Sequence, residues 1–196
     1  MISIGITGGI GSGKTMVSHI LKAMGYPIYN ADLEARTIID TNPEVIEQIK
    51  LLFGNDIYVG GKLDRAKVSN LVFNDNSLLQ NLNSIVHPAV AQHFNAWKAG
   101  NASAKLTFKE AAIIFESGAY KQVDGVVAVV APQELRIARV CQRDGVSPEQ
   151  VMQRMANQLS DEELVAKSDF VLINDGIRLL LPQVTELISK FLKDNN

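Results

Sequence analysis

Short, continuous runs of apolar residues recur along the chain and predict the strands of a buried sheet. A strand of a parallel sheet is covered on both faces, so its residues are apolar without alternation. The segments that fit this description are residues 1–6 (MISIGI), 26–32 (YPIYNAD), 111–115 (AAIIF), 125–131 (GVVAVVA) and 169–173 (DFVLI). We therefore predict an α/β protein with a parallel sheet of five strands.

Apolar residues at helical spacing fill most of the chain between these strands. A helix is predicted at 14–24, directly after the first strand and a glycine-rich loop, and others at 32–40, 43–53, 64–73, 75–85 and 88–98. The last five lie between the second and third strands, in a stretch far longer than a parallel crossover needs. We interpret this stretch as an inserted helical lobe, in which YVGGKLD (58–64) predicts a mobile or hairpin-like turn.

A second insertion follows the fourth strand and its helix, and it is charged. It begins near Arg143 and continues through Arg154. We predict three parts on this basis: a core of residues 1–31, 86–140 and 164–196, a helical acceptor-binding lobe of residues 32–85, and a short helical lid of residues 141–163. Together they predict a three-layer α/β/α fold.

Composition adds exclusions to this picture. A formal charge of −2 offers no polycationic face, so we expect no nucleic-acid partner. One cysteine, Cys141, excludes an internal disulfide, and no apolar run reaches the length of a membrane span. No leader pattern is present, and we expect a cytoplasmic protein, monomeric or weakly homo-oligomeric, that binds small molecules and no membrane.

The sequence GITGGIGSGKT (5–15) contains the phosphate-loop motif G-x-x-x-x-G-K-[ST]. Glycines let successive backbone N–H groups turn around phosphate oxygens, and the following helix adds its positive dipole end. The motif predicts an ATP site at Gly8, Gly9, Gly11, Ser12, Gly13, Lys14, Thr15 and Met16. Lys14 is expected to reach the β and γ phosphates and Thr15 to ligate Mg²⁺. The alternative is a glycine-rich turn with an exposed lysine.

The loop alone does not separate GTPases, motor ATPases and small-molecule kinases. The chain has no guanine-reading N-K-x-D segment. It also has no apolar strand that ends in Asp after the loop, since AIIFE ends in Glu116. Kinases of small metabolites tolerate this arrangement, because the nucleotide's own phosphates can hold most of the magnesium shell.

Candidate acceptor residues follow the second predicted strand, where ligands bind in open α/β sheets. Asp32 can take a proton from an acceptor hydroxyl or cap the next helix. Arg36, four residues on, can hold a substrate phosphate or pair with Asp32. Arg143 and Arg139 can neutralise charge on the transferring phosphoryl group. For Arg139, pairing with the helix dipole is the favoured alternative.

Several segments in order resemble the dephospho-coenzyme A kinase family: GITGGIGSGKT, NADLEAR (30–36), NSIVHP (83–88), QRDG (142–145) with RMANQ (154–158), and SDFVLINDG (168–176). The resemblance implies that Asp32 faces the ribose 3′-hydroxyl of dephospho-coenzyme A, with Lys14 and Arg143 as the other catalytic residues. It also places Arg36, His87 and Glu116 at the acceptor, Arg143 in the lid, and Asn174 beside the adenine of ATP. The family implies a fold of the phosphate-loop kinase type and the cofactors ATP and Mg²⁺.

Three positions depart from the pattern of this family. Asn30 replaces the first Asp of D-A-D, Ala112 replaces the Pro of P-L-L-F-E, and Thr15 replaces the commoner Ser. The residues alone predict transfer of the γ-phosphoryl of ATP to an alcohol, and only the resemblance names the acceptor. The alternatives are a kinase of another metabolite or of a nucleoside monophosphate, and a regulator that binds ATP without acceptor-dependent turnover.

Overall fold

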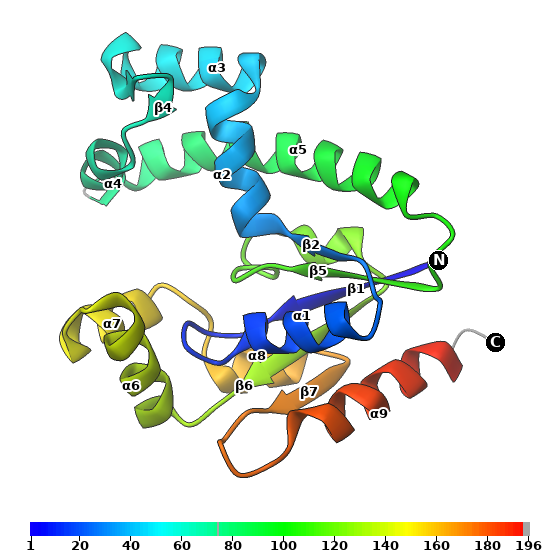
Figure 1. Cartoon of the computed structure of the whole chain (residues 1–196). Coiled ribbons are helices and arrows are strands. Elements are labelled where there is room, and N and C mark those ends of the chain that lie inside the picture. Colours follow the sequence, from blue (N-terminus) through cyan, green and yellow to red (C-terminus); the bar gives the residue numbers. More distant parts are fainter. Residues whose placement is uncertain (74, 194–196) are drawn as a thin grey trace. The chain divides into compact units, whose positions relative to one another are not determined.

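The computed structural model describes residues 1–73 and 75–193, which form two compact units (Figure 1). The first unit comprises Met1–Asn30 and Lys98–Asn196, and the second comprises Ala31–Trp97. The predicted lobe, residues 32–85, lies within the second unit. Within the described part of the chain, every helix is too short or too polar to cross a bilayer.

The first unit is built on a parallel sheet. Its strands are β1 (Ile2–Thr7), β2 (Ile28–Asn30), β5 (Leu106–Glu110), β6 (Gly125–Val130) and β7 (Phe170–Ile173). They pair in the order β2-β5-β1-β6-β7, all parallel, so the predicted five-stranded parallel sheet is confirmed. Because parallel strands share their carboxyl edge, the residues that follow β1, β5 and β6 lie at one edge of the sheet.

Helices cover this sheet on both faces, which gives the three-layer fold. On one face α1 (Lys14–Ala23) packs beside α9 (Leu180–Lys193), with a core that includes Ile4, Ile6 and Leu187 (Figure 1). The other face contacts α8 (Asp161–Lys167) and the segment 111–122, which ends in the short helix η2 (Ala119–Gln122). Side chains from both layers exclude water from the sheet, which stabilises the strands.

The third predicted strand is wrong in its position. The strand is Leu106–Glu110, whereas residues 111–115 form a turn. Leu106 and Phe108 point into the core, but the buried polar residues Thr107, Lys109 and Glu110 interrupt the apolar run. Residues 111–115 are apolar because this turn packs on the sheet. The fully buried Ile114 covers Gly5 of β1 on the face opposite α1 and α9.

Helices dominate the second unit: α2 (Ala31–Thr41), α3 (Pro43–Phe53), α4 (Arg65–Phe73) and α5 (Asn76–Gly100), whose residues from Lys98 on belong to the first unit. After the short η1 (Asn55–Ile57), β3 (Tyr58–Val59) and β4 (Lys62–Leu63) form an antiparallel hairpin, as predicted. Helices predicted at 75–85 and 88–98 are one helix instead. It continues through Pro88, with Val86 and Phe94 buried on either side of that residue.

Two short helices carry the segment predicted as the lid. After α6 (Gln133–Asp144) the chain forms α7 (Pro148–Met155) and then α8. Both α7 and α8 begin with a capping box, in which Ser147 pairs with Gln150 and Ser160 with Glu163. Such reciprocal side-chain bonds satisfy the first N–H groups of short helices, which explains why these two form despite their length.

Candidate active site at the phosphate loop

The phosphate loop lies between β1 and α1, in the strand, loop and helix context that its motif requires. Gly13 caps α1 with a left-handed backbone (φ 102°), a conformation that other residues rarely adopt. The ammonium of Lys14 donates to the carbonyl oxygens of Gly8 (2.6 Å) and Gly9 (3.3 Å). The lysine is thereby held over its own loop, at the positive end of α1, where an anion is favoured.

A carboxylate that the sequence interpretation missed lies beside the loop. Glu110 ends β5, and its Oε1 accepts a hydrogen bond from the hydroxyl of Thr15 at 2.9 Å. Its Oε2 lies 3.4 Å from the amide nitrogen of Asn30, at the end of β2. Glu110 is 4% exposed. The strand that ends in an acid next to β1 therefore exists, and its acid is Glu110 in place of Glu116.

This cluster fits a magnesium ion bound together with nucleotide phosphates. Mg²⁺ prefers oxygen ligands and keeps several waters or phosphate oxygens in its shell. Thr15 and Glu110 offer a hydroxyl and a carboxylate that are already in contact. Within residues 1–73 and 75–193, no group of three or more His, Cys, Asp or Glu side chains could hold a metal by itself. The donor set therefore suits an ion that arrives with a nucleotide.

Side chains from distant elements contact the backbone of the loop. Arg136 and Arg139 of α6 donate to the carbonyl oxygens of Ile10 and Gly11, at 2.9 and 3.4 Å. Asn174, after β7, donates to the carbonyl of Ser12 at 2.8 Å. The predicted ATP residue Asn174 thus lies against the loop. Arg139, for which pairing with the helix dipole was favoured, bonds instead to the loop and to Asn174.

Arg136 was not predicted as a site residue. Its side chain is almost fully buried and pairs with Asp161 at the start of α8 (2.6 Å). A signal for it exists in the sequence, since Arg136 stands four residues before the buried Val140, on the inner face of α6. An arginine on the apolar side of an amphipathic helix needs a buried partner, and such a partner indicates a structural or functional contact.

The predicted lid arginine, Arg143, lies at the end of α6. Its guanidinium forms a two-pronged ion pair with Asp144 (2.7 and 3.0 Å), which raises the pKa of Arg143 and lowers that of Asp144. Arg154 of α7 shares the same carboxylate. Glu116, predicted at the acceptor, accepts the backbone N–H of Leu159 at 3.1 Å and so contacts the connection between α7 and α8.

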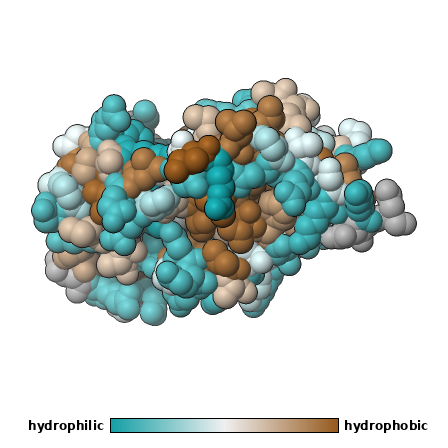
Figure 2. Space-filling model, turned by 90° about the horizontal axis from the view of Figure 1, so that it is seen from below, coloured by the Kyte–Doolittle hydropathy of each residue, from teal (hydrophilic) through white to brown (hydrophobic). Residues whose placement is uncertain are grey.

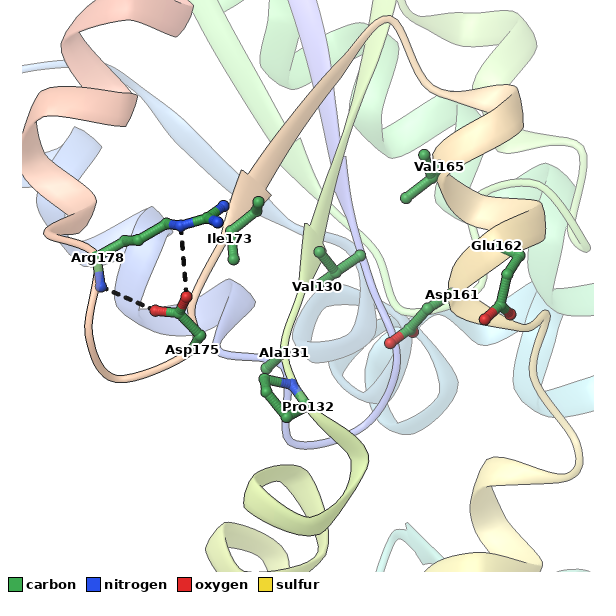
Figure 3. A pocket seen from close by; sticks show the side chains of 9 residues that line it. All are labelled: Val130, Ala131, Pro132, Asp161, Glu162, Val165, Ile173, Asp175 and Arg178. Carbon is green, nitrogen blue, oxygen red and sulfur yellow. Dashed lines mark hydrogen bonds and ion pairs between the residues drawn. The ribbon is translucent and has the colours of Figure 1, made fainter.

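A pocket of about 440 Å³ opens at the carboxyl ends of β6 and β7 (Figure 3). Asp161 and Glu162 line one side, and Asp175, paired with Arg178 at 3.5 Å, lines the other. Three carboxylates beside one paired arginine make this pocket unsuited to phosphate groups, which the loop attracts instead. Figure 2 shows apolar side chains gathered on the face seen from below. The exposed apolar residues of the first unit include Ile177 and Leu179.

The second unit carries the remaining candidates. Asp32 and Arg36 are exposed on α2, and Asp32 is in its first turn because β2 ends at Asn30, two residues earlier than the sequence predicted. His87 is half-buried within α5, and burial lowers its pKa, which favours the neutral imidazole. A neutral imidazole can both donate and accept a hydrogen bond.

Comparison with known proteins agrees with these features. The family model described as dephospho-CoA kinase matches residues 2–178. The dephospho-CoA kinase of Bacteroides fragilis is 43% identical over 188 residues, which are 96% of this chain and 92% of that protein. A solved structure from Thermus thermophilus (35% identity, TM-score 0.84) covers 100% of this chain and 98% of its own. The dephospho-CoA kinase structure from Campylobacter jejuni (28%, TM-score 0.71) covers 99% and 98%. The chain therefore belongs to the dephospho-CoA kinase family.

Proposed function

We propose that this protein transfers the γ-phosphoryl group of ATP to the ribose 3′-hydroxyl of dephospho-coenzyme A, giving coenzyme A and ADP. This is the last step of coenzyme A synthesis, and we assign it to the cytoplasm. The observation that carries the proposal is an intact phosphate loop, in which Lys14 contacts the Gly8 carbonyl and Thr15 contacts Glu110. The chain that holds this loop matches the family over residues 2–178.

The nucleotide half of the reaction rests on the first unit. Backbone N–H groups of the phosphate loop and of the first turn of α1 bind the phosphates. Lys14 leaves the carbonyls of Gly8 and Gly9 to reach the β and γ groups. Thr15 and Glu110 would hold Mg²⁺, which supplies charge neutralisation at the transferring phosphoryl group. Glu110 then has two tasks, because it orients the Thr15 hydroxyl and adds charge beside the ion.

The acceptor half rests on Asp32. Its carboxylate takes the proton of the 3′-hydroxyl as the phosphoryl group transfers, while Arg36, His87 and Glu116 bind the acceptor. The lobe that carries Asp32 and the lid that carries Arg143 close over both substrates and exclude water, which would otherwise accept the phosphoryl group. Asn174 contacts the adenine of ATP. Arg143 exchanges its pairing with Asp144 for the phosphates, whose charge is larger.

The acceptor specificity decides between this function and its alternatives. Purified protein is incubated with ATP and Mg²⁺, and ADP release is measured with dephospho-coenzyme A, adenosine monophosphate, shikimate or no acceptor. We expect release to be stimulated by dephospho-coenzyme A at least a hundredfold above any other condition. Equal stimulation by shikimate would assign a kinase of another metabolite, and equal stimulation by adenosine monophosphate would assign a nucleoside monophosphate kinase. ATP binding without stimulation by any acceptor would favour the regulator.

A further inference from the structure

We propose that Arg136, Arg139 and Asn174 are positioning residues that fix the direction of the N–H donors of the phosphate loop. The proposal rests on the proposed function to the extent that this loop binds the phosphates of ATP. These residues act through the backbone of the loop and do not need to touch the transferring group. Arg136 and Arg139 lie on α6, and Asn174 follows β7, so two separate elements hold one loop.

The contacts fall on consecutive peptide groups. Arg136 Nε donates to the carbonyl oxygen of Ile10 at 2.9 Å, and Arg139 Nη1 donates to that of Gly11 at 3.4 Å. Asn174 Nδ2 donates to the carbonyl oxygen of Ser12 at 2.8 Å. Arg139 also donates to the Asn174 side-chain oxygen at 3.4 Å, which turns the amide so that its nitrogen faces the loop.

Peptide geometry converts these contacts into a direction for the donors. The peptide bonds of the loop are trans, and the C=O and N–H of a planar trans peptide point in opposite directions. A carbonyl of Ile10 that points to Arg136 therefore directs the N–H of Gly11 away from α6. By the same argument, the carbonyl of Ser12 bonded to Asn174 directs the N–H of Gly13 toward the space that the loop encloses.

The peptide group between Gly9 and Ile10 precedes these three. In this group the N–H, and not the carbonyl, is bonded from outside the loop. Gln158 accepts the N–H of Ile10 from outside the loop at 2.8 Å. The carbonyl of Gly9, which belongs to the same peptide group, then points inward. There it accepts from the N–H of Ser12 at 3.2 Å and from Lys14 Nζ at 3.3 Å. The inward direction predicted from the outer contacts is thus the direction in which the loop's own bonds form.

Close approach of the holding side chains explains two of the glycines. A Cβ atom at Gly9 would lie 2.0 Å from Arg136 Nη2, and one at Gly13 would lie 2.0 Å from Asn174 Nδ2. Both distances are far below van der Waals contact. Glycine at these positions lets Arg136 and Asn174 reach the backbone of the loop. The hydrogen bonds from these two side chains therefore require glycine at both positions.

We expect Arg136 to act by orienting the peptide groups of the loop, and not by adding positive charge beside the phosphates. Its guanidinium is neutralised by Asp161 at 2.6 Å, and its side chain is 6% exposed. Asn174 carries no charge at all. An ion-paired arginine and a neutral amide share the ability to hold a carbonyl in place, so a common effect of both on phosphate binding would arise from the geometry of the loop.

The test measures binding of inorganic tripolyphosphate and of ATP by calorimetry, in the whole protein. Tripolyphosphate carries no base, so a lost contact between Asn174 and adenine cannot change its affinity. The variants are Arg136→Met and Asn174→Leu, with Lys14→Ala as the reference for loss of the loop. Lys105→Gln is the control, because it removes one positive charge from an exposed position before β5. Unfolding temperature and far-UV circular dichroism confirm that each variant is folded.

We expect both variants to raise the Kd for tripolyphosphate about tenfold, the effect of misdirecting one or two hydrogen-bond donors. Lys105→Gln should stay within about twofold of wild type. Wild-type affinity in both folded variants, with loss in Lys14→Ala, would overturn the proposal, and so would loss in Arg136→Met alone. If Arg136→Met does not fold, Asn174→Leu decides by itself. These measurements use no acceptor, so a failure of the proposed kinase activity would be seen separately.

Discussion

The hydroxyl of Thr15 donates a hydrogen bond to the buried carboxylate of Glu110, although the two residues are 95 positions apart. The parallel pairing of β1 with β5 creates this contact, because Ile6 of β1 is in register with Glu110. Thr15 lies in the first turn of the helix that follows β1, and Glu110 ends the neighbouring strand. The carboxyl edge of the sheet thus joins the phosphate loop to an acid that the loop motif does not contain.

Glu110→Gln tests whether this acid supports the magnesium site. The substitution keeps the shape of the side chain and removes its charge. We expect kcat to fall and the Mg²⁺ concentration for half-maximal activity to rise, each by about tenfold to a hundredfold, as for other residues that support a metal. Steady-state assays across Mg²⁺ concentrations measure both. An unchanged Mg²⁺ dependence in folded Glu110→Gln would show that Glu110 has no such role.

Asp32→Asn separates acceptor chemistry from nucleotide binding. The amide cannot accept the proton of the acceptor hydroxyl, so we expect kcat to fall by about a hundredfold or more while ATP affinity stays unchanged. Lys14→Ala should instead lose both activity and ATP affinity. Calorimetry with ATP and assays with saturating dephospho-coenzyme A provide the measurements. Normal turnover by Asp32→Asn would remove Asp32 from the mechanism.

Gly9→Ala probes the close approach of Arg136 from the side of the loop. The new Cβ would meet Nη2 of an arginine that is already bonded to Ile10 and Asp161, so the guanidinium must leave the Ile10 carbonyl. We expect the protein to fold and the Kd for ATP to rise about tenfold. Gly100→Ala is the control, since a Cβ there meets no atom within 4 Å. Equal ATP affinity in both variants would contradict the expectation.

Lys109 predicts a pH dependence of stability. Its side chain is 1% exposed, its ammonium donates to Gln122 at 2.6 Å, and burial lowers its pKa to about 8. Between pH 8 and the ordinary lysine value of 10.5, the folded protein therefore binds fewer protons than the unfolded chain. The free energy of unfolding should rise with pH over this interval.

Lys109→Met isolates that contribution. The variant removes the buried ionisable group, so its free energy of unfolding should rise less steeply with pH from 8 to 10.5 than that of wild type. It should also be the more stable protein at pH 7, where wild type bears the cost of a buried cation. Urea denaturation at several pH values gives both results. Parallel pH profiles for the two proteins would show that Lys109 has an ordinary pKa.

Local patterns in the sequence predicted the parts of this fold that depend on local causes. The loop, the helix after it and the hairpin at Gly60 and Gly61 were found because glycine spacing and apolar periodicity act over a few residues. The strand β5 was misplaced because Lys109 interrupts its apolar run, and the burial of a lysine beside Gln122 depends on the packing of distant segments.

The candidate site was predicted where a motif exists and missed where contacts are long-range. Lys14 and Thr15 follow from the loop motif alone. Glu110 and Arg136 do not, because only the pairing of strands and the packing of α6 bring them to the loop. Asn174 was predicted by resemblance for contact with adenine, and its bond to the Ser12 carbonyl is visible only in three dimensions.

The identity of the phosphorylated product tests the central claim most directly. Protein, ATP, Mg²⁺ and dephospho-coenzyme A are incubated, and the products are separated and compared with authentic coenzyme A by mass and by position of the new phosphate. We predict one new product, coenzyme A, in which the new phosphate is at the ribose 3′ position, in an amount equal to the ADP released. ADP without coenzyme A, or a phosphate at another hydroxyl, would contradict the proposed function.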